Sequence, residues 1–164
     1  NKTYAFNRKT FGELMAIYRA PVDDMMFLFE KLRDNSHYNS LEKYKEVNPD
    51  LAKDILEQAS KLTENIILPL AKAGDETPAK LENGVVRTPP GYKEAYKKFI
   101  DDGWVSLSCD PEYGGQGMPN TIKTFFDEML SSASLSFKLY SELSIGAYNC
   151  IVHHGTDSIK KKFA

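Results

Sequence analysis

The 164-residue sequence predicts an all-α fold with one small β-hairpin near residues 80–88. Four observations lead to this prediction. Apolar residues recur at steps of three or four along several segments, which is the spacing of a helix with one buried face. Prolines mark several helix starts, and one Asn-Gly pair between short β-type runs is the strongest hairpin signal. A hydrophobic content of 41% is sufficient for a substantial core.

The first helix is expected to open at Ala20-Pro21, because proline lacks the N–H that the first helical turn leaves unpaired. Asp23 and Asp24 follow, where negative charge complements the helix N-terminus. Residues 34–36 are expected to end the helix. Its apolar stripe is predicted to comprise Met25, Leu28, Phe29 and Leu32.

The clearest helix begins at Asn48, a good N-cap, with Pro49 at the first helical position and Asp50 in the first turn. Pro69 is expected to kink it near its end, because proline removes one backbone hydrogen bond. Gly74 is the expected C-terminal stop. The predicted buried face comprises Leu51, Ile55, Ala59, Leu62, Ile66 and Leu70.

Asn83-Gly84 is expected to form a hairpin turn between residues 80–82 and 85–87, since both residues tolerate positive φ. Residues 89–91 (Pro-Pro-Gly) then lead into another helix that Gly103 closes. The apolar residues of this helix are Tyr92, Ala95, Tyr96, Phe99 and Ile100. Residues 104–109 alternate apolar and polar side chains, which predicts a brief extended segment.

The stretch DPEYGGQGMPN, residues 110–120, places three glycines within four positions. These glycines either let the backbone turn tightly beside a ligand cavity or serve a helix connector that needs positive φ. Pro119 is expected to start the next helix. Residues 131–134 (SSAS) either break that helix or continue it into a second apolar helix, 135–154, which Gly155 ends. The inner side of the first part is predicted to carry Ile122, Phe125, Phe126, Met129 and Leu130.

Thr156 is a good N-cap for a last helix, with Ile159 and Phe163 on one face. Because the sequence stops after barely two turns of that helix, it is expected to be the opening part of a longer chain. A run of three lysines at 160–162 is expected to be a solvated helix face, although it could touch a phosphate.

The composition and the residue spacing argue against several classes of function. The net charge of −2 provides no overall field that would attract nucleic acid or an anionic membrane. No apolar run approaches the roughly 20 residues that span a bilayer. Cys109, Cys150 and the His153-His154 pair match no metal spacing, so no metal site is predicted. Cys150 is expected to be buried and Cys109 to pack within the loop, and low cysteine use suits a reducing cytoplasm.

Three features in order resemble the N-terminal helical domain of acyl-CoA dehydrogenases. They are GWVSLSCDPEYGGQGMP (103–119), the amphipathic helix after it, and SIGAYNCIVHHGTDSIKKKF (144–163). YRAPVDDMMFLF (18–29) and NGVVRTPPGYKEAYKKFIDDGW (83–104) resemble a larger bacterial branch that includes enzymes acting on methylthiopropanoyl-CoA. The resemblance implies an N-terminal extension with one helix at 1–36. Residues 37–164 would form the family's N-terminal α domain, without its middle β domain and C-terminal helical bundle.

The resemblance also implies the chemistry of a longer parent. That parent would oxidise an acyl-CoA to the 2-enoyl-CoA in fatty acid β-oxidation, with FAD taking the hydride and an electron-transfer flavoprotein taking the electrons. The family's glutamate base lies in the C-terminal domain, so this chain is expected to hold no catalytic residue and to be inactive alone. Glu142 is not assigned as the base. A cytoplasmic homo-oligomer is expected.

Two sets of candidate site residues follow from the resemblance. The family's pocket-lining helix segment matches Tyr140, Ser141, Glu142, Leu143, Ile145 and Gly146, for which ordinary helix packing is the alternative. Glycine inside a helix costs up to about 1 kcal/mol relative to alanine, which favours a packing or access reason for Gly146. The loop residues expected near the cavity are Tyr113, Gly114, Gly115, Gly117 and Met118.

Other functions remain open at this point. Within the enzyme class, the alternatives are a methylthiopropanoyl-CoA dehydrogenase and a relative similar to acyl-CoA oxidases. A self-standing helical interaction module without redox chemistry is the alternative from another class. The dehydrogenase hypothesis predicts a bare apolar face that includes part of residues 135–151, whereas a self-standing module would have no such face.

Overall fold

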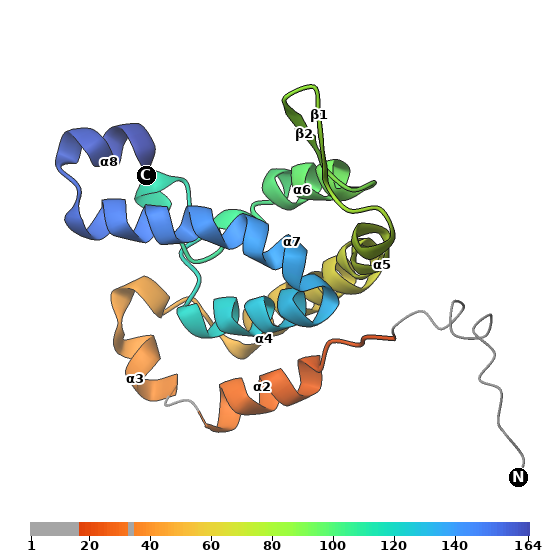
Figure 1. The fold of residues 1–164 in the computed structure, drawn as a ribbon. Coiled ribbons are helices and arrows are strands. Elements are labelled where there is room, and N and C mark those ends of the chain that lie inside the picture. Colours follow the sequence, from red (N-terminus) through yellow and green to blue (C-terminus); the bar gives the residue numbers. More distant parts are fainter. Residues whose placement is uncertain (1–16, 33–34) are drawn as a thin grey trace, which may run out of the picture.

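The computed structural model describes residues 17–32 and 35–164, and these form a set of packed helices with one projecting hairpin (Figure 1). The predicted all-α class with a small hairpin is confirmed. The helices are α2 (Val22–Lys31), α3 (Asn35–Ser40), α4 (Pro49–Leu62), a π-helical turn (Thr63–Ile67), α5 (Leu68–Glu76), α6 (Tyr92–Asp101), α7 (Asn120–His154) and α8 (Asp157–Phe163). The strands are β1 (Lys80–Glu82) and β2 (Val85–Arg87), and short 3₁₀ turns lie at Glu42–Tyr44, Trp104–Ser106 and Pro111–Tyr113.

Helix α2 starts directly after Pro21 as predicted, but it ends earlier, and only Met25 and Phe29 of the predicted stripe are buried. It ends at Lys31, and residues 35 and 36 already belong to α3. The buried residues are Met25, Met26 and Phe29, whereas the predicted stripe residues Leu28 and Leu32 are exposed. Packing against α4 determines which face of α2 is buried, and the apolar spacing within α2 does not determine it alone.

The start of α4 is confirmed by its cap. The Asn48 side chain accepts a hydrogen bond of 2.9 Å from the Leu51 N–H, and Pro49 is the first helical residue. The buried face continues through the π-helical turn into α5 and comprises Ala52, Leu56, Ala59, Leu62, Thr63, Ile67 and Leu70. The predicted Leu51, Ile55 and Ile66 are only half-buried. Ala59, Leu62 and Leu70 of the predicted face are buried, as expected. Because α4 packs against both α2 and α7, Ala52 and Leu56 are buried as well.

The irregularity expected at Pro69 takes the form of the π-helical turn immediately before it. Pro69 has no N–H to donate to the carbonyl of Asn65, so the regular α-helical pattern cannot continue there. Gly74 does not end the helix, because α5 runs on to Glu76. A Cβ on Gly74 would lie 2.7 Å from the hydroxyl of Tyr92, so the glycine makes room for that side chain instead.

Glu64, in the π-helical turn, holds the segment that precedes α2. Its carboxylate accepts hydrogen bonds from the Ala20 N–H at 3.0 Å and the Ser60 hydroxyl at 2.9 Å, and it pairs with Arg19. Burial acts to raise the pKa of Glu64, but these hydrogen bonds and the Arg19 charge outweigh it and lower the pKa. The ionised carboxylate therefore stabilises the folded state.

Glu64→Gln is expected to flatten the acid end of the stability profile. Since the folded-state pKa is depressed, the stabilisation is present above the ordinary value of 4.5 and is lost as the pH falls through the lower folded value. Urea unfolding between neutral pH and pH 3 measures this. Glu94→Gln, on the exposed surface of α6, is the control. Equal acid sensitivity of the wild type and Glu64→Gln would contradict the anchoring role.

The hairpin matches its prediction. Asn83 and Gly84 have φ of 51° and 78°, as a two-residue hairpin turn requires, and Lys80 pairs with Arg87 across the antiparallel strands. All six strand residues are exposed, so the hairpin projects from the helices (Figure 1).

The end of α6 at Gly103, with φ of 78°, is confirmed. The predicted extension of residues 104–109 is wrong, since a 3₁₀ turn at Trp104–Ser106 leads into further turns. Ser106 N–H bonds to the Gly103 carbonyl and Cys109 N–H to the Ser106 carbonyl. These tight turns bury Leu107 and Cys109, and they produce the alternating pattern without a strand.

Helix α7 both breaks and continues at the SSAS stretch. All five predicted inner residues, Ile122 to Leu130, are buried. Ser134 then has φ −160° and ψ 100°, and the chain folds back on itself there (Figure 1). This divides α7 into an N-terminal arm, residues 120–133, and a C-terminal arm, residues 135–154. Gly155 ends the second arm, and the Thr156 side chain caps α8, as predicted.

Candidate functional site

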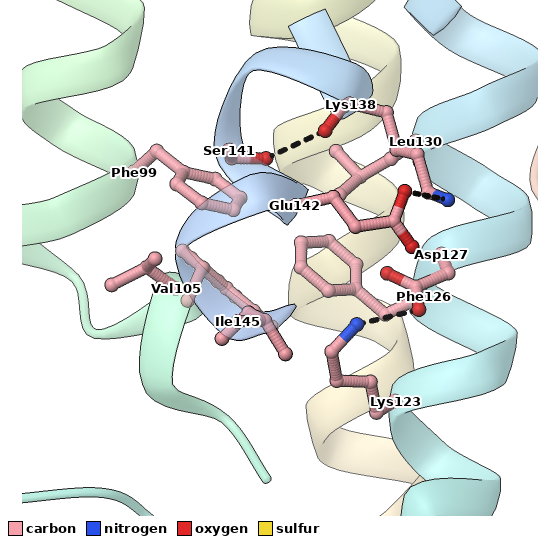
Figure 2. A pocket seen from close by; sticks show the side chains of 11 residues that line it. Phe99, Val105, Lys123, Phe126, Asp127, Leu130, Lys138, Ser141, Glu142 and Ile145 are labelled. Carbon is pink, nitrogen blue, oxygen red and sulfur yellow. Dashed lines mark hydrogen bonds and ion pairs between the residues drawn. The ribbon is translucent and has the colours of Figure 1, made fainter. Parts of the chain in front are cut away.

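The six predicted acyl-pocket residues lie on the C-terminal arm of α7, where the structure divides them between two faces. Ser141, Glu142 and Ile145 line a cavity between the two arms (Figure 2). Tyr140 and Leu143 do not line this cavity and are largely exposed, Leu143 to 79%. A Cβ added to Gly146 would meet nothing within 4 Å. The prediction identified one helix, but its members do not form a single pocket wall.

The cavity between the arms is small. Its volume is about 20 Å³, which is room for about one water molecule and not for an acyl chain. The remaining lining residues are Phe99, Trp104, Val105, Lys123, Phe126, Asp127, Leu130 and Lys138. The packing alternative for Ser141, Glu142 and Ile145 therefore describes their surroundings in this structure.

Two ion pairs border this cavity (Figure 2). Lys123 Nζ lies 2.5 Å from Asp127 Oδ2 on the N-terminal arm, and Lys138 pairs with Glu142 on the C-terminal arm. Both lysine side chains are only 16% exposed, so each ammonium depends on its partner for charge compensation. The Glu142 carboxylate is therefore paired with Lys138 and is not free.

The opposite face of the C-terminal arm carries a bare apolar stripe. Leu135, Leu139 and Leu143 are 56%, 53% and 79% exposed, and Cys150 is an exposed thiol. With Gly146 they follow at steps of four, four, three and four, which places all five on one helix face. We call these five residues the α7 stripe. Leu135 and Leu139 were missed as candidates, although their spacing from Leu143 could have identified them. The expected burial of Cys150 is wrong because this face has no packing partner among the described residues.

The glycine-rich loop is a closely packed connector. Gly114 and Gly117 have φ of 83° and 67°, and a Cβ on Gly115 would lie 2.1 Å from the Cys109 carbonyl oxygen. The backbone amides of residues 115–118 bond to carbonyls of Asp110, Ser106, Cys109 and Leu107 at 2.9–3.1 Å. None of the predicted loop residues, Tyr113 to Met118, lines the cavity between the arms. The positive φ values and the close approach at Gly115 are what a compact connector requires.

Residues 17–32 and 35–164 carry neither a membrane-spanning helix nor a metal-binding group. No helix in these ranges has both the length and the apolar character to cross a bilayer. In the same ranges, no three or more His, Cys, Asp or Glu side chains are grouped so that they could hold a metal ion. Cys109 is a buried thiol, as expected, and His153 and His154 are exposed in the last turn of α7.

Within residues 17–32 and 35–164, fold and site together define a helical domain with one apolar helix face that no other described segment covers. Residues 49–164 match the family model of the acyl-CoA dehydrogenase N-terminal domain. The chain therefore belongs to the acyl-CoA dehydrogenase family.

Two relatives give the scale of the match. The chain is 40% identical over 143 residues to the 3-methylmercaptopropionyl-CoA dehydrogenase of Ruegeria pomeroyi, covering 87% of this chain and 24% of that protein. It is 27% identical over 150 residues to the broad-specificity linear acyl-CoA dehydrogenase FadE5 of Mycobacterium tuberculosis, covering 90% and 24%. The chain thus spans about a quarter of the length of these curated relatives.

Proposed function

We propose that this chain is the N-terminal domain of a longer, flavin-dependent acyl-CoA dehydrogenase that converts an acyl-CoA thioester to the 2-enoyl-CoA. The observation that carries the proposal is the α7 stripe, an exposed apolar face on a member of this enzyme family. Large contiguous apolar patches are rare on the surface of monomeric proteins and mark binding or interaction sites. The rest of the longer protein and the acyl chain are its proposed partners.

The proposal divides the six predicted pocket residues by role. Leu143 and Gly146 belong to the α7 stripe, and Tyr140 is exposed beside it with its ring edge-on to Tyr96 of α6; these three are proposed to meet the acyl chain. Ser141, Glu142 and Ile145 lie behind them, against the N-terminal arm, and hold the C-terminal arm in place. No residue of this chain is proposed as the base, and the bonding of Glu142 to Lys138 supports a structural role for that carboxylate.

FAD is the proposed hydride acceptor of the longer protein. The residues around the α7 arms do not fit it, because a cavity of about 20 Å³ is far smaller than the flavin ring system. Flavin binding is therefore assigned to other parts of the longer protein. An electron-transfer flavoprotein as electron acceptor, a homo-oligomeric state and a cytoplasmic location belong to the same proposal, as does the division into an extension at 1–36 and a domain at 37–164.

The first substrate to test is a short sulfur-containing acyl-CoA. The relative named for 3-methylmercaptopropionyl-CoA is 40% identical, whereas the relative named for linear acyl-CoA is 27% identical. Linear acyl-CoA thioesters of increasing length are the second group. Both are dehydrogenated by the same chemistry, so the two substrate groups differ in the fit of the acyl chain.

The test is an assay of the full-length protein, loaded with FAD, on both substrate groups with a dye as electron acceptor. Enoyl-CoA formation is expected from the full-length protein, with the higher kcat/KM for the sulfur-containing substrate, and no turnover is expected from residues 1–164 alone. Peroxide formed in place of dye reduction would indicate the oxidase-like alternative. A flavin-loaded full-length protein that dehydrogenates no acyl-CoA would refute the proposed function.

A further inference from the structure

The hydroxyl of Tyr148, near the end of the C-terminal arm, reaches the base of the glycine-rich loop. It accepts a hydrogen bond of 2.7 Å from the Asp110 backbone N–H, which lies 38 residues earlier in the chain. The Tyr148 ring also meets the Tyr113 ring edge-on, with centroids 6.5 Å apart. Tyr148 is half-buried, and its spacing from Ser141 and Ile145 places it on the inner face of the arm, opposite the α7 stripe.

The loop that Tyr148 contacts is rigid in its own right. Gly115 and Gly117 bond back to the carbonyls of Asp110 and Cys109, and the Asp110 carboxylate accepts a further bond of 3.0 Å from the Glu112 N–H. The Cys109 side chain is buried; burial raises the pKa of its thiol, and the charge of Lys123 and then the Tyr148 hydroxyl oppose this rise. A contact to Asp110 is therefore a contact to the whole loop.

The arm is held differently along its length. Near Ser134, the buried Phe137 ring packs against α6. In its middle, the Lys138–Glu142 pair and Ser141 lie against the N-terminal arm. Toward its end, Asn149 and Cys150 are exposed, and Tyr148 supplies the contact to the loop. Ile151 and Val152 beyond it are half-buried, and α8 packs against α7. Tyr148 thus adds a hydrogen bond to the loop in the part of the arm that carries Gly146 and Cys150 of the α7 stripe.

We propose that Tyr148 is a positioning residue that fixes the C-terminal arm of α7 by its hydrogen bond to the glycine-rich loop. By bonding the loop, Tyr148 sets the position of the C-terminal arm and so the shape of the apolar face on the other side of that arm. This assigns the three glycines an indirect role, through the arm, in place of contact with a ligand. The expected effect on KM for acyl-CoA rests on the proposed function, whereas the positioning of the arm by Tyr148 does not.

Tyr148→Phe in the full-length protein removes the hydroxyl and keeps the ring. The partly buried Asp110 N–H then lacks its acceptor, which is expected to raise local opening about tenfold. Hydrogen exchange read by mass spectrometry should show this acceleration in peptides covering Asp110 and residues 144–152. For acyl-CoA turnover, KM is expected to rise while kcat changes less than about twofold, since ground-state and transition-state binding weaken together.

Tyr44→Phe is the matched control, because Tyr44 is also half-buried but lies outside the loop and α7. It should leave exchange at Asp110 and KM at the wild-type values. Unchanged exchange in Tyr148→Phe would overturn the proposal. So would a fall in kcat and melting temperature with KM unchanged, which indicates a general loss of stability. If the full-length wild type shows no acyl-CoA activity, the proposed function fails, and the exchange measurement alone decides the role of Tyr148.

Discussion

Gly115→Ala is expected to destabilise the 164-residue chain by about 3 kcal/mol or more, which is beyond the usual cost of overpacking. The new Cβ would lie 2.1 Å from the carbonyl oxygen of Cys109 and 2.2 Å from its carbonyl carbon. These are backbone atoms, and the same oxygen accepts a hydrogen bond of 2.9 Å from the Gly117 N–H. Relief of the clash therefore requires the whole loop to move. Urea unfolding and thermal melting measure the loss.

Gly146→Ala is the matched control on the C-terminal arm of α7. Nothing lies within 4 Å of the added Cβ, and the position is helical, so the change is expected to stabilise the chain by up to about 1 kcal/mol. The two variants differ from wild type by the same methyl group, yet their effects should have opposite signs. Similar losses of stability in both would show that the loop is not packed as described.

Phe137→Ala is expected to destabilise the chain by about 3–5 kcal/mol, the range for a large ring removed from a core. Phe137 is 1% exposed and lies just after the reversal at Ser134. Its ring centroid is 5.5 Å from that of Phe99 and 6.4 Å from that of Tyr96, both on α6. Truncation leaves a cavity where the C-terminal arm meets α6. The free energy of unfolding from urea titration measures the effect.

Leu143→Ala provides the comparison for Phe137, since it removes a large apolar side chain from the same arm. Leu143 is 79% exposed, so its truncation should change the free energy of unfolding by less than about 0.5 kcal/mol. In the full-length protein the same variant is expected to weaken acyl-CoA binding. A large loss of stability from Leu143→Ala in the 164-residue chain would show that the α7 stripe is packed and not bare.

Local chemistry in the sequence predicted several elements because their signals lie within a few residues. Asn48 caps α4 with its own side chain, and Asn83-Gly84 takes the positive φ values of a hairpin turn. Gly74 shows the limit of such signals. Its partner is the Tyr92 side chain, 18 residues further on, so a glycine needed for close approach looked like a helix stop. Contacts between distant segments are not encoded in local spacing.

In the candidate site, too, local features could be predicted and contacts between distant segments could not. The residues that the resemblance indicated all lie on the C-terminal arm of α7, and the bare apolar face predicted within residues 135–151 is present in Leu135, Leu139 and Leu143. The reversal at Ser134 determines which face of the C-terminal arm is buried, because it brings the N-terminal arm against Ser141 and leaves Leu143 exposed. The SSAS stretch was compatible with both a break and a continuation of the helix, so the sequence did not predict the reversal. The role of Tyr148 depends on a loop 38 residues away and had no local signal.

The most direct test of the central claim is the alkylation rate of Cys150 in the 164-residue chain and in the full-length protein, read by peptide mass spectrometry. Cys150 is exposed on the α7 stripe, whereas the buried Cys109 reports general unfolding in both samples. The proposed function predicts fast reaction of Cys150 in the 164-residue chain and much slower reaction in the full-length protein, where the face is covered. Equal Cys150 rates in the two proteins, with Cys109 protected in both, would contradict it.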